Sequence, residues 1–223
     1  MRYTAGMNVV VLGASGGCGK QLVELASQRG HRVTAVARVS STLEVPPGVR
    51  VDRGDLTSVE FLRGVLEGQD AVLSALGLKL PGLSPWSKAE DPTFLSRSTA
   101  ALVEACRARG VKRVLAISAG GVGDSAANVP GAFRVLIKLS ALKTAYAQLE
   151  DMERQLLGSG LDVCLPRPTG LTDGPLTKQV VVAERFKGRA TISRADVAFW
   201  MLEQLERPTF GHRTPMITVT GAS

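Results

Sequence analysis

The chain of 223 residues is poor in aromatic residues and cysteines, and it contains no long apolar run. Its two Trp, two Tyr and six Phe offer little surface for stacking nucleic-acid bases, and its basic residues are dispersed along the sequence. We therefore expect no nucleic-acid partner. The net charge of +7 is better explained by a positive field that attracts an anionic cofactor and substrate.

No stretch approaches the ~20 consecutive apolar residues that a membrane span requires. The N-terminus also lacks the charged-then-apolar pattern of a secretory signal. We therefore expect a cytoplasmic protein with no membrane partner.

The three cysteines, Cys18, Cys106 and Cys164, are an odd number and lack the spacing of metal ligands. This pattern predicts neither a disulfide framework nor a metal site. Cys18 differs from the others because it stands at the start of an expected helix, where the helix dipole can lower a thiol pKa. A redox role for Cys18 is therefore open, beside a simple backbone contact with a cofactor.

The segment 7–26 places an apolar strand, a glycine-rich turn and an amphipathic helix in succession. Gly13 permits a tight turn, Gly16 lets a diphosphate approach the backbone, and Gly19 lets the helix pack closely on the strand. The free N–H groups of the first helical turn would face the anion along the helix dipole. In this context the pattern favours a dinucleotide site over a ligand-free glycine turn. The expected contacts are Gly13, Ser15, Gly16, Gly17, Cys18 and Gly19.

Residues 31–38 are expected to form a second parallel strand whose end lies beside the adenosine ribose. An NAD-selective chain would offer an acid there, whereas this one offers Arg38, followed by Ser40 and Ser41. A guanidinium suits a 2′-phosphate, so the expected cofactor is NADP(H). The alternative is a solvated surface arginine.

A short strand at 49–51 leads into Gly54-Asp55-Leu56. Asp55 and Leu56 have the position and residue types to bracket the adenine. The alternative is a turn that caps the helix beginning after it, and Asp55 or Thr57 could serve both purposes.

Strands and helices alternate along the rest of the chain, which predicts an α/β fold with a doubly wound parallel sheet, the Rossmann fold. We expect one domain over residues 7–223 with a small C-terminal extension on the substrate side, preceded by a disordered extension at 1–6. Ligands of such sheets bind across the carboxyl ends of the strands. Ala75, Leu76 and Gly77 follow one of these ends and are expected cofactor contacts.

Two loops are expected over the same edge of the sheet. The loop 78–91 carries Trp86, which could cover a planar substrate ring or simply anchor the loop. The glycine-rich loop 119–128 is flexible enough to move over a bound ligand.

These segments together resemble the atypical short-chain dehydrogenase/reductases, in particular the NAD(P)H-binding group of biliverdin reductase B, a flavin reductase. The resemblance spans nearly the whole chain. It rests on the motifs at 13–19, 54–56, 117–119, 159–162, 167–173 and 192–198 and on the Gly-His pair at 211 and 212. It implies a site for extended NADPH in which Ser118 lies near the nicotinamide and Arg167, Pro168 and Thr169 border the same ring.

The usual catalytic pair of short-chain dehydrogenases is Tyr-x-x-x-Lys, in which the lysine lowers the tyrosine pKa. Here Tyr146 is followed at that spacing by Glu150, whose carboxylate would raise the phenol pKa. Lys143, one turn before Tyr146, leaves a rewired pair open; otherwise Tyr146 packs against the cofactor loop. Ser118 is the expected catalytic residue, because its hydroxyl can orient the nicotinamide or the substrate.

Such a site suits acceptors that take a hydride without a strong protein acid. Flavins (FMN or FAD, here as substrates), quinones and linear tetrapyrroles qualify, because their conjugated rings delocalise the incoming charge. The leading interpretation is an NADPH-dependent reductase of a planar small molecule. The alternative is a non-catalytic NADP(H)-binding redox sensor or assembly factor resembling NmrA-like proteins. The sequence leaves the oligomeric state open.

Overall fold

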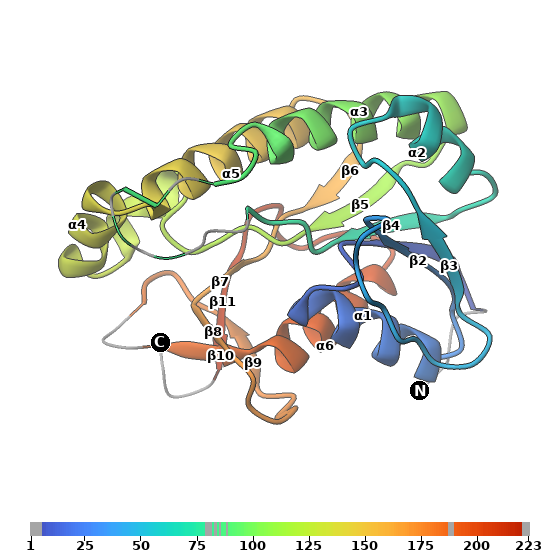
Figure 1. Cartoon of the computed structure of the whole chain (residues 1–223). Helices are drawn as coiled ribbons and strands as arrows, with labels where there is room; N and C mark the ends of the chain where they lie inside the picture. The colour runs from blue at the N-terminus through green and yellow to red at the C-terminus, as the bar shows by residue number, and fades with distance from the viewer. Residues whose placement is uncertain are drawn as a thin grey trace.

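A six-stranded, all-parallel sheet forms the centre of the protein, with strand order β3-β2-β1-β4-β5-β6 (Figure 1). The computed structural model describes residues 6–78, 82, 84, 86–87, 89–186 and 190–219. The order reverses at β1, as in doubly wound sheets, so the predicted fold class is confirmed. The strands are β1 (Asn8–Leu12), β2 (Arg32–Ala37), β3 (Arg50–Arg53), β4 (Ala71–Ser74), β5 (Arg113–Ala116) and β6 (Asp162–Cys164).

Helices cover both faces of this sheet. Helices α1 (Gly17–Gln28) and α6 (Arg194–Leu205) pack against each other on one face. Helices α2 (Val59–Val65), α3 (Phe94–Arg109) and α5 (Leu142–Leu157) cover the other (Figure 1).

The central strand β1 shows why its sequence is apolar throughout. Val9 and Val11 belong to the core layer beneath α1 and α6, whereas Val10 and Leu12 belong to the opposite layer. All four side chains are at most 1% exposed. Successive side chains of a strand point to opposite faces, so a strand buried on both faces must be apolar at every position.

The C-terminal part adds two small sheets beside the carboxyl edge of the main sheet. Strands β7 (Arg167–Pro168), β11 (Met216–Val219) and β9 (Val180–Val182) form one, and β8 (Gly170–Thr172) with β10 (Thr191–Ser193) forms the other. The sequence predicts strands at 179–183, 190–192 and 215–219, which correspond to β9, β10 and β11. It does not predict β7 and β8, because the segment 167–172 mixes proline, glycine and threonine and shows no strand pattern. The whole is a single domain.

The loop expected at 119–128 contains a short 3-10 helix, η1 (Gly123–Asn128), which is followed by α4 (Gly131–Leu139). The expected N-terminal extension lies outside the described residues except for Gly6. Among the helices that the structure describes, none combines the length and apolar character needed to span a membrane.

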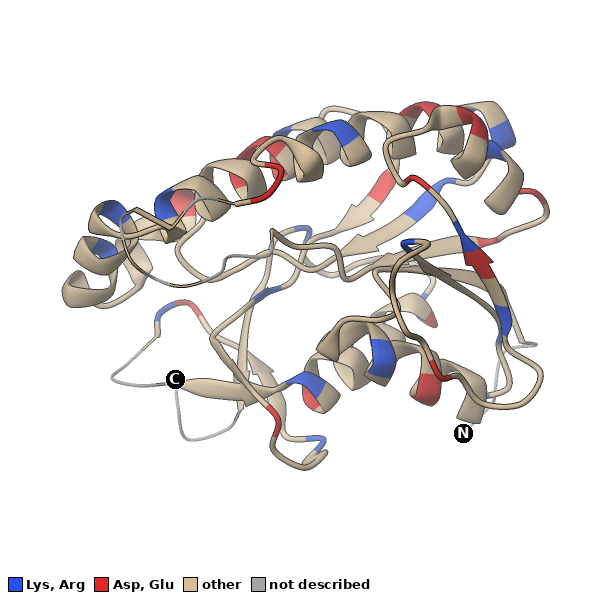
Figure 2. Cartoon of the chain, viewed as in Figure 1, with Lys and Arg blue, Asp and Glu red and all other residues tan. Residues whose placement is uncertain are grey.

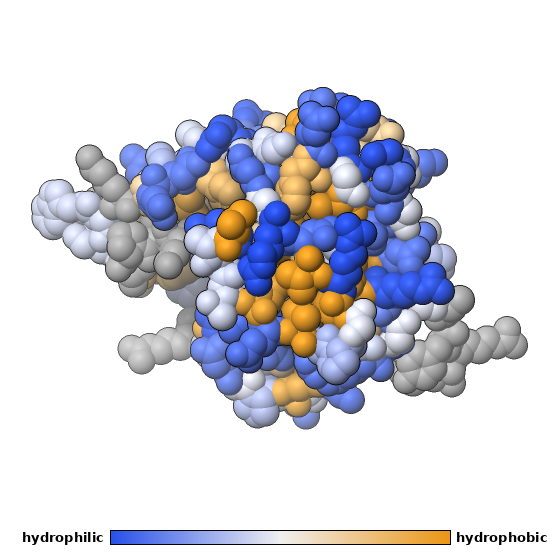
Figure 3. Space-filling view, turned by 45° about the vertical axis from the view of Figure 1, so that its right-hand side comes forward, coloured by the Kyte–Doolittle hydropathy of each residue, from blue (hydrophilic) through white to orange (hydrophobic). Residues whose placement is uncertain are grey.

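Charged residues of both signs are intermixed along the outer helices (Figure 2). On the face drawn in Figure 3, apolar surface gathers near the middle and is bordered by hydrophilic residues. This mixed distribution of charge agrees with the prediction that the protein has no nucleic-acid partner, which stays a prediction.

Candidate cofactor and substrate site

The glycine turn between β1 and α1 has the geometry of an anion cradle. Helix α1 begins at Gly17, and its N-cap residue Gly16 supplies no side-chain cap. Gly13 has φ +75°, and a Cβ on it would lie 2.9 Å from the Ala75 carbonyl oxygen. A Cβ on Gly19 would lie 2.1 Å from the Gly13 carbonyl oxygen. The turn and packing roles predicted for Gly13 and Gly19 are confirmed, and the first-turn amides of α1 are left for a ligand.

An arginine from the far end of the chain lies over this turn. A Cβ on Gly17 would be 2.5 Å from Cδ and 2.8 Å from Nε of Arg194, the first residue of α6. The Arg194 guanidinium donates to Asp173 Oδ1 at 2.7 Å. Glycine at position 17 therefore makes room for a cation beside the N-terminus of α1. Sequence reasoning missed this role because positions 17 and 194 are brought together only by α1–α6 packing.

The position of Arg194 is fixed by the cap of its helix. Ser193 is the N-cap of α6, and its hydroxyl oxygen accepts from the backbone N–H of Asp196 at 2.9 Å. The fully buried Asp196 carboxylate in turn accepts from the backbone N–H groups of Thr177 and Lys178, both at 2.8 Å. The motif at 192–198 thus anchors the C-terminal segment and orients Arg194.

Cys18 lies in the first turn of α1, as predicted, but its thiol is buried. Burial raises the pKa of Cys18 to about 11, and the nearby Arg194 charge offsets this only in part. The pKa of Cys18 is therefore raised, opposite to the direction expected from its place at a helix start, and the thiol is protonated at neutral pH. This argues against a redox role for Cys18.

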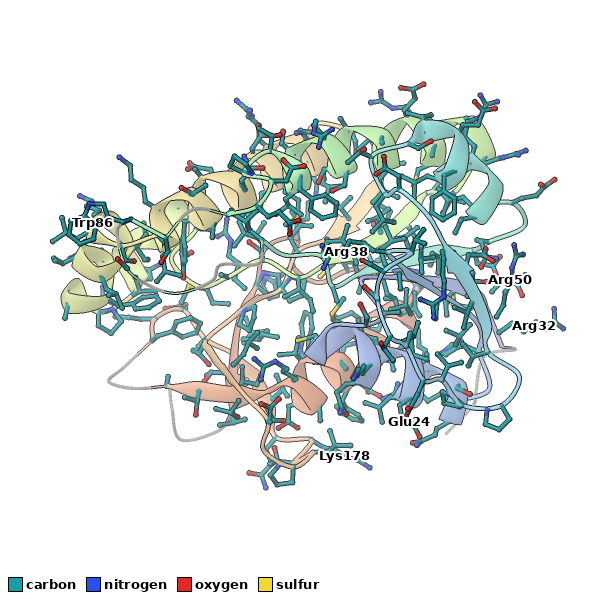
Figure 4. All side chains as sticks on the ribbon, in the orientation of Figure 1. Glu24, Arg32, Arg38, Arg50, Trp86 and Lys178 are labelled. Atoms are coloured by element: carbon teal, nitrogen blue, oxygen red, sulfur yellow. The ribbon has the colours of Figure 1, made fainter. Side chains whose placement is uncertain are left out.

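Arg38 is exposed directly after β2, where the adenosine ribose is expected (Figure 4). Its guanidinium has no hydrogen-bond or ion-pair partner among the residues that the structure describes. Arg53, at the end of the neighbouring strand β3, donates to the Ser41 carbonyl oxygen at 2.5 Å. Two guanidinium groups therefore lie at one edge of the sheet. Sequence reasoning named only Arg38, because Arg53 reads as the last residue of a short strand.

The Gly54-Asp55-Leu56 segment forms a turn before α2, as expected if its role is to lead into the helix and not only to contact the adenine. The Asp55 carboxylate accepts from both the backbone N–H and the hydroxyl of Thr57, each at 2.8 Å, and these bonds lower the pKa of Asp55. The predicted cap of α2 is wrong, because Ser58 accepts from Phe61 N–H instead. The Leu56 side chain is buried in the core, so only the backbone of Leu56 is left for a cofactor. The adenine contact of Asp55 stays a prediction.

The segment after β4 packs against the glycine turn. Ala75 N–H donates to the Leu12 carbonyl oxygen at 2.9 Å, and Leu76 Cδ2 lies 3.2 Å from the Cβ position of Gly13. Ala75, Leu76 and Gly77 thus lie at the predicted edge of the sheet. Their contact with a cofactor stays a prediction.

A largely apolar cavity of about 640 Å³ opens beside the end of β5. Its walls come from the loop after β5, from α4, from the start of α5 and from β7 and β8. The described lining residues are Ser118, Ala119, Gly120, Val129, Pro130, Ala132, Phe133, Leu136, Leu142, Tyr146, Pro168, Thr169, Gly170, Leu171, Phe186 and Ala190. Volumes of 300–1,000 Å³ are typical of small-molecule sites.

Trp86 does not line this cavity. Its side chain is 85% exposed, and Figure 4 places it at the end of the molecule that carries α4. Its role as a cover for a substrate ring stays a prediction.

A buried ionic network lies behind the cavity wall. Ser118 Oγ donates to Glu153 Oε1 at 2.5 Å, and Arg167 Nε donates to the same oxygen at 2.9 Å. Arg167 Nη2 donates to Glu153 Oε2 at 2.6 Å, and Nη1 donates to Asp124 Oδ1 at 2.5 Å. The Glu153 and Arg167 side chains are each 5% exposed. Burial disfavours the Arg167 cation, but its bonds to Glu153 and Asp124 outweigh burial and raise the pKa of Arg167.

The expected contact of Arg167 with the nicotinamide stays a prediction, but the network gives this residue other partners. Its guanidinium is held by Glu153 and Asp124 and does not line the cavity, whereas Pro168 and Thr169 do. Sequence reasoning missed Glu153 entirely. Glu153 reads as one of several charged residues of α5, and only tertiary packing shows that it is buried.

Tyr146 lines the cavity and is held there by contacts with Gly120 and Phe133. Its hydroxyl donates to the Gly120 carbonyl oxygen at 3.0 Å, and its ring meets Phe133 edge-on at 6.3 Å. Burial raises the pKa of Tyr146 to about 12, so burial and not Glu150 is the cause. Lys143 is exposed, with no bond to Tyr146. The packing interpretation of Tyr146 is therefore favoured over a rewired catalytic pair.

These features fit a dinucleotide, because the glycine turn leaves the space and the amides that a diphosphate needs. Residues 13–208 match the model of a family described as NAD(P)H-binding. An uncharacterized chloroplastic protein from Arabidopsis thaliana is 30% identical over 205 residues, which span 88% of this chain and 71% of that protein.

Two solved structures share the fold. ChuY, an anaerobilin reductase from Escherichia coli O157:H7, superposes with a TM-score of 0.76 at 20% identity, over 97% of this chain and 98% of that one. A short-chain dehydrogenase/reductase from Veillonella parvula in complex with NADP superposes with a TM-score of 0.77 at 17% identity, over 97% and 96%. The family match confirms the expected NAD(P)H-binding group and its dinucleotide cofactor, and the superpositions confirm the fold. The chain belongs to the NAD(P)H-binding family.

Proposed function

We propose that this protein is an NADPH-dependent reductase that transfers a hydride to a planar conjugated acceptor held in the cavity beside β5. The observation that carries the proposal is the cavity itself, about 640 Å³ and largely apolar. Ser118 on its wall follows β5, and the glycine turn follows β1, so both lie at the carboxyl edge of one parallel sheet. Ligands of doubly wound sheets bind at this edge.

The polar end of the site supports NADPH as the donor. The amides of the first turn of α1, together with Arg194, would hold the diphosphate. Arg38 and Arg53 would hold the 2′-phosphate, because guanidinium groups bind phosphates with paired N–H donors. When bound there, the reduced nicotinamide supplies the hydride.

The side chains around the cavity orient a ring and exclude water, but those that the structure describes offer no strong acid. The Tyr146 hydroxyl is bonded to a carbonyl and its pKa is raised to about 12. The acceptor must therefore stabilise the incoming charge by conjugation and take its proton from solvent. A flavin (FMN or FAD), a linear tetrapyrrole or a quinone meets this requirement. The shared fold with an anaerobilin reductase supports a tetrapyrrole among these candidates.

The second candidate function is a non-catalytic NADP(H)-binding redox sensor. It is favoured by one observation: Lys143 is exposed and Tyr146 is bonded to Gly120, so the usual catalytic pair is not assembled. Binding of NADPH without turnover would be the expected behaviour of such a sensor.

The two candidates separate in one assay. NADPH oxidation is followed by nicotinamide absorbance with FMN, FAD, menadione and biliverdin in turn, and NADPH affinity is measured in parallel. Oxidation that depends on one acceptor and disappears in Gly16→Val supports the reductase. Tight NADPH binding with no oxidation of any acceptor would refute the reductase and favour the sensor.

A further inference from the structure

Two hydroxyl groups in the wall of the cavity have already used their protons. Ser118 Oγ donates to the Glu153 carboxylate, and Tyr146 Oη donates to the Gly120 carbonyl oxygen. A carboxylate and a carbonyl can only accept, so the direction of both bonds is unambiguous. Each hydroxyl has one proton and two lone pairs, so lone pairs are what it has left for a ligand.

The Ser118 bond is difficult to reverse. Glu153 is held by Arg167 through both of its oxygens, at 2.9 Å and 2.6 Å. The 2.5 Å distance to Ser118 Oγ is in the range of charge-assisted O–H···O⁻ bonds. Turning the Ser118 proton toward the cavity would leave a buried carboxylate oxygen one hydrogen bond short, which is unfavourable for a charged group.

Neighbouring backbone donors are used in the same way. Ser118 N–H donates to the Pro166 carbonyl oxygen at 2.8 Å, and Gly120 N–H donates to the Pro168 carbonyl oxygen at 2.9 Å. Thr169 is different, because its hydroxyl lies 3.4 Å from that of Thr218 and either of the two can donate.

We propose that Ser118 and Tyr146 act as hydrogen-bond acceptors toward a bound ring, so that the cavity selects planar rings carrying an N–H donor at their edge. This deepens the proposed function and rests on it. It is the reverse of a site whose serine and tyrosine donate protons to a substrate carbonyl. Among the candidate acceptors it favours flavins and linear tetrapyrroles, which carry N–H groups, over quinones, which carry none.

The N–H donor can belong to the nicotinamide carboxamide of the cofactor or to the acceptor ring, and two binding experiments distinguish these sources. The first arm compares NADP with its 3-acetylpyridine analogue, which keeps the carbonyl but lacks the carboxamide N–H. The second arm compares lumiflavin with 3-methyllumiflavin in the presence of NADP. Calorimetry measures the first pair, and flavin fluorescence measures the second.

In at least one arm, the native protein should bind the N–H ligand about tenfold more tightly than its matched partner, the difference expected for one satisfied hydrogen bond. Ser118→Ala or Tyr146→Phe should reduce that preference to less than about twofold. The exposed Lys143→Ala, on the same helix as Tyr146, serves as the matched control and should keep the preference. Circular dichroism checks that each variant is folded, and the two cavity variants are independent of each other.

The inference is overturned if neither ligand pair shows a preference, or if the preference survives in both Ser118→Ala and Tyr146→Phe. These outcomes are separate from failure of the proposed function, because binding is measured without turnover. A protein that reduces no acceptor but discriminates NADP from its acetylpyridine analogue through Ser118 would refute the reductase and support the inference.

Discussion

Replacing Glu153 by Gln tests how much the buried ionic network contributes to the free energy of unfolding. Glu153 accepts one bond from Ser118 and two from Arg167, and its side chain is 5% exposed. The amide keeps the shape of the side chain but removes the charge and presents an N–H₂ group to Arg167 or to Ser118. Breaking a buried ion pair costs about 3–5 kcal/mol.

Asp124 remains bonded to Arg167 in this variant, but its side chain is 84% exposed, so it offsets only part of the loss. We therefore expect the free energy of unfolding to fall by about 3 kcal/mol, at the lower end of that range. For a chain of this length, this corresponds to a Tm lower by about 6–12 °C.

Urea unfolding of the native protein and Glu153→Gln measures the effect, and Glu150→Gln is the matched control. Glu150 is exposed on the same helix, so its substitution should change the free energy of unfolding by less than about 0.5 kcal/mol. The double variant Glu153→Gln/Arg167→Met should be less destabilised than the sum of the single variants, because the uncompensated charge is gone. If Glu153→Gln is as stable as Glu150→Gln, the network does not hold the site and the reasoning is wrong.

Three further predictions concern the proposed site. Arg38→Ala should remove about 1.5–3 kcal/mol of the preference for NADPH over NADH, measured as Kd values; equal affinity of the native protein for both cofactors would contradict it. Gly16→Val should abolish NADPH binding in a folded protein, checked by calorimetry and circular dichroism, because a branched side chain fills the diphosphate path. Tyr146→Phe should keep most of the NADPH-dependent reduction of FMN, whereas Ser118→Ala should lose more; a ~100-fold fall in kcat for Tyr146→Phe with normal NADPH binding would show that Tyr146 is an acid.

The order of the main elements could be predicted because each one carries a local signal. The glycines of the turn lie within seven consecutive residues, so the motif is visible in the sequence. Strand β1 is buried on both faces, so nearly all of its residues are apolar. Arg38 follows its strand directly, so its place at the carboxyl edge of the sheet follows from the parallel topology.

Other parts of the site depend on packing between distant segments and leave no local signal. Glu153 is buried, whereas Glu150 on the same helix is exposed. The Tyr-x-x-x-Lys spacing from Tyr146 points to position 150, so sequence reasoning considered Glu150 and not Glu153. Arg194 meets Gly17 only because α1 and α6 pack together. Arg167 belongs to the expected motif, but its role as the partner of Glu153 becomes visible only once α5 is placed against β7.

The most direct test of the proposed reductase is isotope transfer. NADPH carrying deuterium at one of the two C4 positions of the nicotinamide, or at the other, is incubated with the protein and each candidate acceptor, and the NADP formed is analysed by mass spectrometry. The proposed function predicts that NADP loses the deuterium of one of the two labelled forms and keeps that of the other, because the site holds both rings in one orientation. Tight binding of NADPH with no NADP formed in the presence of any acceptor, or equal loss of deuterium from both forms, would contradict it.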